Sequence, residues 1–254
     1  MEKIREIAPD IFRISTFLPE VNMQMNQFLV RDEEPLLWHT GQRFLFEEVL
    51  GSVAKLIDLS TLRWIGFSHF EADECGALNE WMQIAPEAQA FCSDVCAGIN
   101  MNDFAVRPVV GMLHDDRIGT GKFSFRFLST PHLPHGWDAG LLFEETNRVL
   151  FSSDILYQSG NPAGLVESDI VGVAGRTLVE DQNKLFTNPI ALTHRTEEQL
   201  KMLGDLVPRT LAVMHGSSYR GNCPAALREF GEVLRNVVGP KDSTIVQFQK
   251  LPAK

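Results

Sequence analysis

Residues 68–78, SHFEADECGAL, place four ionisable side chains directly after the short apolar run at residues 64–67. These side chains are His69, Glu71, Asp73 and Glu74, which fall within six consecutive positions. Ionisable groups are costly to bury at the edge of a core unless something pairs with them. A bound metal ion is one such partner. The stretch therefore predicts a metal site at the end of a buried strand, in a fold that brings further ligands to the same point.

Composition excludes several other classes of protein. The 254 residues are 44% hydrophobic and 22% charged, without a linker, repeat or low-complexity tract, so we expect one domain over residues 1–254. No apolar stretch approaches the roughly 20 residues of a membrane span, and no secretory signal begins the chain, so we expect a cytoplasmic protein away from membranes.

The net charge of -10 argues against binding nucleic acid. Four cysteines are too few for a disulfide framework, and we interpret them as buried or incidental thiols.

The order of the expected elements indicates a layered fold. β-favouring runs bounded by turn residues predict strands, and apolar residues at helical spacing predict helices. The predicted strands cover residues 11–15, 27–31, 35–39, 63–68, 88–92, 123–129, 140–144, 149–152, 210–214 and 244–249, with a hairpin turn at 145–148. The predicted helices cover residues 44–57, 76–86, 176–184, 197–207 and 225–237, whereas residues 160–173 show turn residues and no clear period. This mix predicts an α/β or α+β layered sandwich.

Further histidines and carboxylates follow other predicted strands. Asp154 follows VLFSS, His215 follows LAVM, and STPHLPHGWDAG offers His132 and His135 after FSFRFL. Strand ends are rigid positions from which side chains can converge on one point. A lone histidine there is usually structural, and a lone aspartate in SSD is usually a helix N-cap. Six such positions in four separate places favour a metal site over these structural roles. They supply enough ligands for two metal ions that share Asp154.

This pattern resembles that of the flavodiiron proteins, a branch of the metallo-β-lactamase superfamily. The separations agree with that family: 61 residues lie between Asp73 and His135, 18 between His135 and Asp154, and 60 between Asp154 and His215. Gly76 and the sequences VLFSSD and AVMHG are also similar to the family's motifs. The resemblance spans roughly residues 10–235. It implies a four-layer αββα sandwich with a dinuclear site at one edge of the sheets.

The resemblance also implies which residues bind metal. His69, Glu71 and His135 would hold one iron, Asp73 and His215 the other, with Asp154 and a solvent-derived oxygen as bridges. His135 is preferred to His132 because Asp138 follows it by three residues, as in the family, and because its spacing to Asp154 fits.

Several residues near these ligands receive secondary roles. His132 is expected to hold a ligand by a hydrogen bond. Tyr219, with Arg220, could orient a substrate. His39 is interpreted as structural, although it could line the site from a neighbouring strand.

The carboxylate-rich ligand set bears on the identity of the metal. Superfamily hydrolases usually have histidine where this chain has Glu71, and they bind zinc. Added carboxylate oxygens favour iron, or manganese, over zinc. Glu74 departs from the family, in which many members have histidine. It could ligate the second metal, hydrogen-bond a bound water, or point away.

Three functions are consistent with these residues. The first is a non-haem diiron protein that binds O2 or NO, reducing it with electrons from a separate protein or sensing it; this is similar to the flavin-free oxygen-binding diiron relatives. The chain has no room for the family's flavodoxin-like domain, so we expect it to bind no FMN. The second is a zinc hydrolase of an ester, thioester or phosphodiester, and the third is a metal-binding protein without turnover.

Two further expectations concern the side chains that line the site and the oligomeric state. An apolar lining formed by Phe70, Leu133, Trp137 and Met214 would favour a small neutral gas over an anionic substrate. Family members often pair head to tail, so the resemblance also allows a homodimer, although the flavin that such pairing serves is not expected here.

Overall fold

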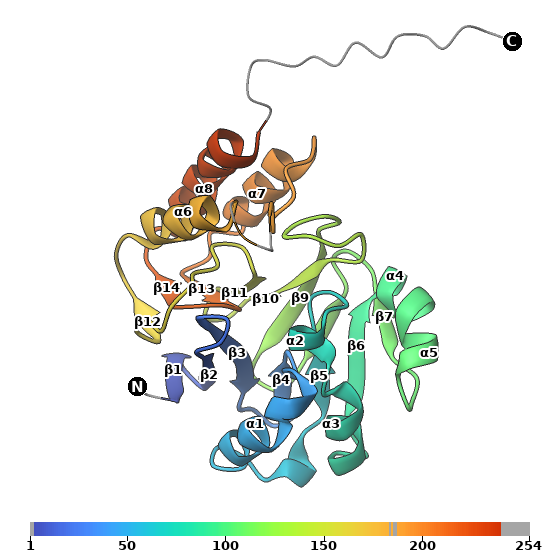
Figure 1. Ribbon diagram of the computed structural model, residues 1–254. Coiled ribbons are helices and arrows are strands. Elements are labelled where there is room, and N and C mark those ends of the chain that lie inside the picture. The colour runs from blue at the N-terminus through green and yellow to red at the C-terminus, as the bar shows by residue number, and fades with distance from the viewer. Residues whose placement is uncertain (1–2, 183, 185–186, 240–254) are drawn as a thin grey trace, which may run out of the picture.

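The computed structural model describes residues 3–182, 184 and 187–239, and two β-sheets form the centre of this part of the chain (Figure 1). Each sheet has seven strands within the described residues. The first sheet is built from β1 (Ile4–Ala8), β2 (Ile11–Leu18), β3 (Met23–Val30), β4 (Leu36–Trp38), β5 (Trp64–Gly66), β6 (Gln89–Ser93) and β7 (Val110–Met112), in that order. Its first four strands are antiparallel, and β4 to β7 are parallel.

The second sheet contains the remaining strands in the order β12-β14-β13-β11-β10-β9-β8. Their bounds are β8 Arg117–Gly119, β9 Ser124–Ser129, β10 Gly140–Glu144, β11 Val149–Ser153, β12 Leu165–Val166, β13 Thr210–Val213 and β14 Ser218–Arg220. β10 is antiparallel to both β9 and β11, and β13 is parallel to β11. Strands β9, β11 and β13 therefore run in one direction and end at the same edge of the sheet.

Helices cover the outer face of each sheet (Figure 1). On the side of the first sheet lie η1 (Arg43–Leu45), α1 (Phe46–Val53), η2 (Leu59–Thr61), α2 (Ala72–Cys75), α3 (Leu78–Ile84), α4 (Asp94–Cys96), the π-helical η3 (Ala97–Met101) and α5 (Asn102–Phe104). The second sheet is covered by α6 (Ile170–Asp181), α7 (Thr196–Asp205) and α8 (Cys223–Val238). None of the helices in the described ranges is long and apolar enough to cross a membrane.

The helices and the two sheets form four layers, and an apolar cluster packs between each neighbouring pair of layers. Trp81 and Val49 pack helices against the first sheet, and Phe230 and Leu203 pack helices against the second. Between the sheets lies an aromatic cluster whose fully buried members include Phe28, Trp38, Phe91, Phe125, Phe127 and Phe151. A layer that is apolar on both faces must be covered on both faces, so this pattern defines the order helix, sheet, sheet, helix. The predicted αββα sandwich is confirmed.

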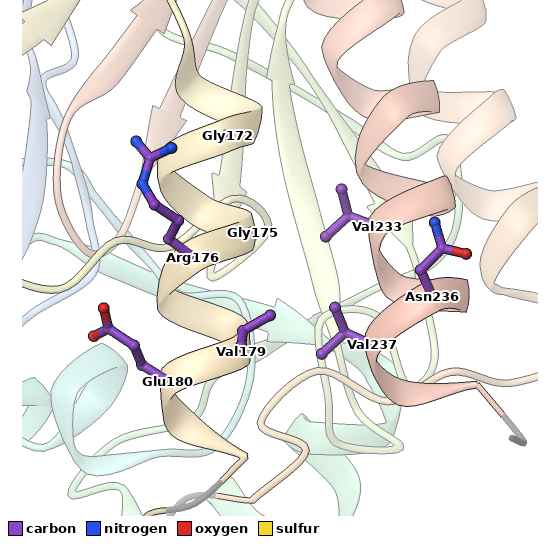
Figure 2. Close-up of a pocket in the computed structure, with 8 residues that line it drawn as sticks. All are labelled: Gly172, Gly175, Arg176, Val179, Glu180, Val233, Asn236 and Val237. Atoms are coloured by element: carbon purple, nitrogen blue, oxygen red, sulfur yellow. The ribbon is translucent and has the colours of Figure 1, made fainter.

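Helices α6 and α8 pack closely where α6 has small residues. A Cβ atom at Gly175 would lie 3.3 Å from Cγ1 of Val233, a tight contact. Figure 2 shows the side chains of Val179, Val233 and Val237 in the shallow hollow between the two helices. Glycine in α6 thus permits the close approach of α8 but weakens the helical pattern in the sequence.

The observed elements differ from the predicted ones mainly at their ends. α6 begins at Ile170, not at residue 176, because Asp169 caps it by accepting a hydrogen bond from the Gly172 N–H. α8 begins at Cys223, two residues before the predicted start, behind an N-cap at Asn222. α1 ends at Val53, four residues before the predicted helix end. The short strands β1, β7, β8, β12 and β14 were not expected, and the predicted strand 244–249 lies outside the described residues.

Candidate metal centre

Both sheets deliver candidate ligands to one place. His69, Glu71, Asp73 and Glu74 lie in the loop after β5 and in the short helix α2. His135 follows β9, Asp154 follows β11 and His215 follows β13. Because these three strands end at the same sheet edge, residues that are 80 positions apart in sequence meet there. The structure thus brings together all seven residues that the sequence singles out as ligands.

One group of ligand atoms surrounds the carboxylate of Glu71. Its Oε2 lies 3.1 Å from Nε2 of His69 and 2.9 Å from Nε2 of His135. The two imidazole rings meet edge to face, 4.4 Å apart at their centroids. Asp154 Oδ2 lies 3.7 Å from each of the same two nitrogens. Four donors from three loops are therefore close enough to contact one ion.

A second group lies on the other side of Asp154. Nε2 of His215 is 3.2 Å from Asp154 Oδ1 and 3.2 Å from Asp73 Oδ2. One oxygen of Asp154 thus faces His69 and His135, while the other faces His215. A carboxylate shared in this way has the arrangement needed to bridge two cations.

Glu74 supports the presence of a cation at this place. Its side chain is fully buried, and within the described part of the chain neither carboxylate oxygen has a hydrogen-bond partner. Its Oε2 lies 3.7 Å from Nε2 of His69. Burial and the neighbouring carboxylates of Asp73 and Asp154 raise its pKa well above the usual value. Because buried polar groups are normally satisfied, this orphaned carboxylate fits a site that holds metal.

The other ionisable groups hold charges of opposite sign. Hydrogen bonds from His135 and His69 lower the pKa of Glu71 to about 2. Burial opposes ionisation of Asp154, but the hydrogen bond and charge of His215 lower its pKa to about 2. Burial likewise opposes protonation of His135, and the hydrogen bond to Glu71 overcomes it, which raises the pKa of His135 to about 9. In the metal-free protein, protons on the histidines therefore balance the negative charge of the carboxylates. A bound metal ion would balance the same charge.

Backbone carbonyls orient two of the histidines. Nδ1 of His135 lies 2.8 Å from the carbonyl oxygen of Pro189, and Nδ1 of His215 lies 2.9 Å from that of Gln24. A carbonyl only accepts, so both Nδ1 atoms carry hydrogen, and both Nε2 atoms face the carboxylates. Partners of this kind fix the ring and tautomer of metal-binding histidines. For His69 the corresponding partner is the hydroxyl of Ser68, 2.9 Å from Nδ1.

The loop that carries His215 is braced from the first sheet. Asn26 donates from Nδ2 to the carbonyls of Val213 and Gly216, 2.8 and 2.9 Å away. Arg13, which is almost fully buried, donates to Gly216 O and to Gln24 Oε1, and burial lowers its pKa to about 10. Neither residue was predicted, because nothing in an isolated strand indicates contact with a loop nearly 200 positions away.

The residues expected to support the ligands are placed differently. His132 is exposed, and among the described residues no hydrogen bond joins its side chain to a candidate ligand. Asp138 takes a supporting role instead, because it is buried and accepts from the N–H of Phe70, 2.9 Å away.

The two other residues near the ligands lie away from the cavity. Tyr219 lies on β14 and packs against the cluster beneath α6 to α8. His39 is fully buried behind Ser68.

A cavity of about 1010 Å³ opens onto the site. Five candidate ligands line it, namely Glu71, Asp73, His135, Asp154 and His215. Its apolar lining is contributed by Phe17, Leu18, Val21, Met23, Met25, Phe44, Leu45 and Ile190. The expected lining was therefore wrong: Leu133 and Met214 are buried in or beside the core, while Phe70 and Trp137 are largely exposed. Proximity in sequence to a ligand did not place these four side chains on the cavity side.

A family model described as the ODP family of beta lactamases matches residues 23–216. The chain belongs to this family. Among curated proteins it is 28% identical over 205 residues to the anaerobic nitric oxide reductase flavorubredoxin of Klebsiella pneumoniae, which covers 78% of this chain and 41% of that protein. It is 25% identical over 212 residues to the rubredoxin-oxygen oxidoreductase of Megalodesulfovibrio gigas, covering 82% and 52%.

A solved member of the ODP family shares the fold over nearly its whole length. The apo chemotaxis sensor ODP of T. denticola is 19% identical, with a TM-score of 0.72 over 90% of this chain and 92% of that one. In contrast, the chain spans only about two fifths to one half of the length of the two curated relatives. The expected relationship to flavodiiron proteins is confirmed.

Proposed function

We propose that this ODP-family chain is a non-haem diiron protein that binds O2 or NO. The observation that carries the proposal is the position of Asp154 between two groups of donors, with one oxygen toward His135 and the other toward His215. His69, Glu71 and His135 would hold one iron, and Asp73 and His215 the other. When bound, a pair of iron ions supplies reversible one-electron chemistry and coordination of a small gas.

The residues present suit iron better than the zinc of a hydrolase. Four carboxylates and three histidines form the candidate set, so hard oxygen donors outnumber imidazoles. Such a set favours iron or manganese, although it does not exclude zinc. Of these four carboxylates, Glu74 would place its anionic oxygen beside His69, 3.7 Å from its Nε2. That charge would stabilise the more oxidised state of the metals.

The apolar cavity wall supports a small neutral ligand. On the apolar part of this wall, Phe17, Met25 and Leu45 offer no hydrogen bond to an anionic ester or phosphate. The relatives are named for the reduction of nitric oxide and for oxygen oxidoreduction, and one structural neighbour is named as a chemotaxis sensor. Reduction of O2 or NO at the proposed centre would require the gas to reach the metals first. We propose that electrons for any reduction come from a separate redox protein.

Metal content and gas binding test the proposal together. Protein made in iron-replete cells is expected to hold close to two irons per chain and to show an oxidised ferric absorption band that is lost on reduction. Anaerobic titration of the reduced protein with O2, and separately with NO, should change the spectrum at one equivalent per diiron pair. Zinc alone from such cells, together with zinc-dependent turnover of a phosphodiester or thioester, would favour the hydrolase instead. Stoichiometric iron with neither response would indicate a metal-binding protein without turnover.

A further inference from the structure

Two buried serine hydroxyls connect ligands from the two sheets. Ser68 Oγ lies 2.9 Å from Nδ1 of His69 and 2.9 Å from Ser153 Oγ. Ser153 Oγ in turn lies 3.4 Å from Asp154 Oδ2, and Nε2 of His39 lies 3.2 Å from Ser68 Oγ. His39, Ser68 and Ser153 are all fully buried, so water does not replace these contacts.

The number of hydrogens on His39, His69 and the two serines determines which group donates in each of these hydrogen bonds. His39 is enclosed by the rings of Trp38 and Phe28, and burial lowers its pKa to about 3, so it carries a single ring hydrogen. Its Nδ1 has no partner within the described residues. A buried N–H without an acceptor is rarer and more costly than an unused lone pair. The hydrogen of His39 therefore belongs on Nε2, where it is donated to Ser68.

The remaining hydrogens follow from that assignment. Nε2 of His69 faces Glu71 and the other carboxylates, so a cation bound there leaves the His69 hydrogen on Nδ1, donated to Ser68. With both lone pairs of Ser68 occupied, its own hydrogen points to Ser153 Oγ. Ser153 then donates to Asp154 Oδ2. In the reverse direction, Ser68 would face three donors, from His39, His69 and Ser153, with only two lone pairs, and Asp154 would lose one donor.

We propose that Ser68 and Ser153 form a one-directional hydrogen-bond relay, from His39 and His69 to Asp154, that sets the tautomer of one metal ligand and the orientation of the carboxylate shared by both metals. The inference rests on the metal centre of the proposed function. His39, Ser68 and Ser153 are positioning residues in it, since they act through hydrogen bonds and none of them is a candidate ligand. The relay also joins the loop after β5 in the first sheet to the end of β11 in the second, so it links His69 directly to the shared Asp154.

Iron binding by serine variants tests the relay energetically. Ser68→Ala and Ser153→Ala should each lower the affinity for ferrous ion about 10- to 100-fold, as measured by competition with a chelator. Ser152→Ala is the matched control, because Ser152 is equally buried on the same strand but, among the described residues, its hydroxyl hydrogen-bonds only to the Ala212 carbonyl, 3.5 Å away. Unchanged affinity in Ser153→Ala would overturn the proposal. If Ser68→Ala does not fold, Ser153→Ala and the spectra below decide alone.

Histidine tautomers test the direction of the relay. In long-range 1H–15N spectra of the diamagnetic zinc-loaded protein, His39 should carry its hydrogen on Nε2 and His69 on Nδ1. A hydrogen on Nδ1 of His39 would refute the assignment. His39→Gln, which keeps an N–H near the Nε2 position, should retain iron affinity that His39→Leu loses. A wild type that binds no iron would refute the proposed function alone, because the tautomer of His39 is also measurable in the metal-free protein.

Discussion

Oε2 of Glu74 lies 3.7 Å from Nε2 of His69, in a fully buried position where no other polar atom of the described residues satisfies it. Several of the groups around it are acidic, which makes a buried charge on Glu74 unfavourable in the metal-free protein. A residue that costs stability without metal and gains a partner with metal makes binding and folding depend on each other.

Glu74→Gln is therefore expected to have opposite effects on the metal-free and metal-loaded proteins. Without metal, the neutral amide should raise the free energy of unfolding by about 1–3 kcal/mol at pH 8, because it removes a negative charge buried among the carboxylates of Asp73 and Asp154. With iron, the variant should bind more weakly and have a higher reduction potential. Urea unfolding of both forms and redox titration measure these changes. Lower stability of the metal-free variant would contradict this account.

The pH dependence of the metal-free protein follows from the same residue. The pKa of Glu74 is raised in the folded state, so folding binds a proton to it. Its contribution to stability is present below the unfolded pKa of 4.5 and is lost as the pH rises through the folded value. Metal-free wild type should therefore lose stability from pH 6 to pH 9 more steeply than Glu74→Gln, as measured by thermal unfolding across that range. Identical slopes would show that Glu74 does not titrate there.

His135→Ala and His132→Ala separate a ligand from a neighbour three residues away. His135 contacts Glu71 and faces Asp154, so its removal should reduce the iron content to one ion per chain or fewer. His132 is exposed, and its substitution should leave close to two irons. Metal analysis after gel filtration gives the comparison. Equal loss in both variants would mean that His135 is not the ligand from this loop.

Iron binding should strengthen as the pH rises. The pKa of His135 is about 9, and that of His215 is raised well above its usual value by its hydrogen bonds to Asp154 and Asp73, although burial opposes this. Both histidines are therefore protonated near neutral pH in the metal-free protein, and metal must displace about two protons. Calorimetry in buffers of different ionisation enthalpy should detect this release between pH 6 and 8. A pH-independent affinity would contradict the assignment.

The sequence predicted the convergence of the candidate ligands better than their surroundings, for a physical reason. His69, Asp154 and His215 each follow a strongly apolar strand, and the ends of such strands are determined by local pattern and by sheet topology. The cavity wall is formed partly by the turn between β2 and β3 and by η1, whose positions depend on how two sheets pack. A local pattern contains no information about that packing, and the expected lining residues were wrong.

The supporting residues show the same division. Ser68 and Ser153 stand directly before His69 and Asp154, so their position in the sequence is a usable signal for hydrogen bonding to a ligand. Asn26 carries no such signal, because its contact with the His215 loop exists only between sheets. The start of α6 was misplaced because Gly172 and Gly175 interrupt the apolar period that packing against α8 requires.

The hydrogen bonds from Asn26 to the His215 loop could support the metal centre itself or only the stability of the fold, and substitution of Asn26 separates these two roles. Asn26→Ala removes two side-chain hydrogen bonds to the carbonyls that flank His215, which should lower the free energy of unfolding by about 2 kcal/mol and weaken iron binding. Asn79→Ala is the control, because Asn79 also makes two bonds, to Phe104 O and from Val106 N, with residues that do not line the cavity. Those bonds are less buried, so a smaller loss of stability without weaker iron binding is expected there. Weaker iron binding in Asn26→Ala alone would therefore come from the position of His215, whereas equal iron binding in both variants would mean that the loop holds its place without Asn26.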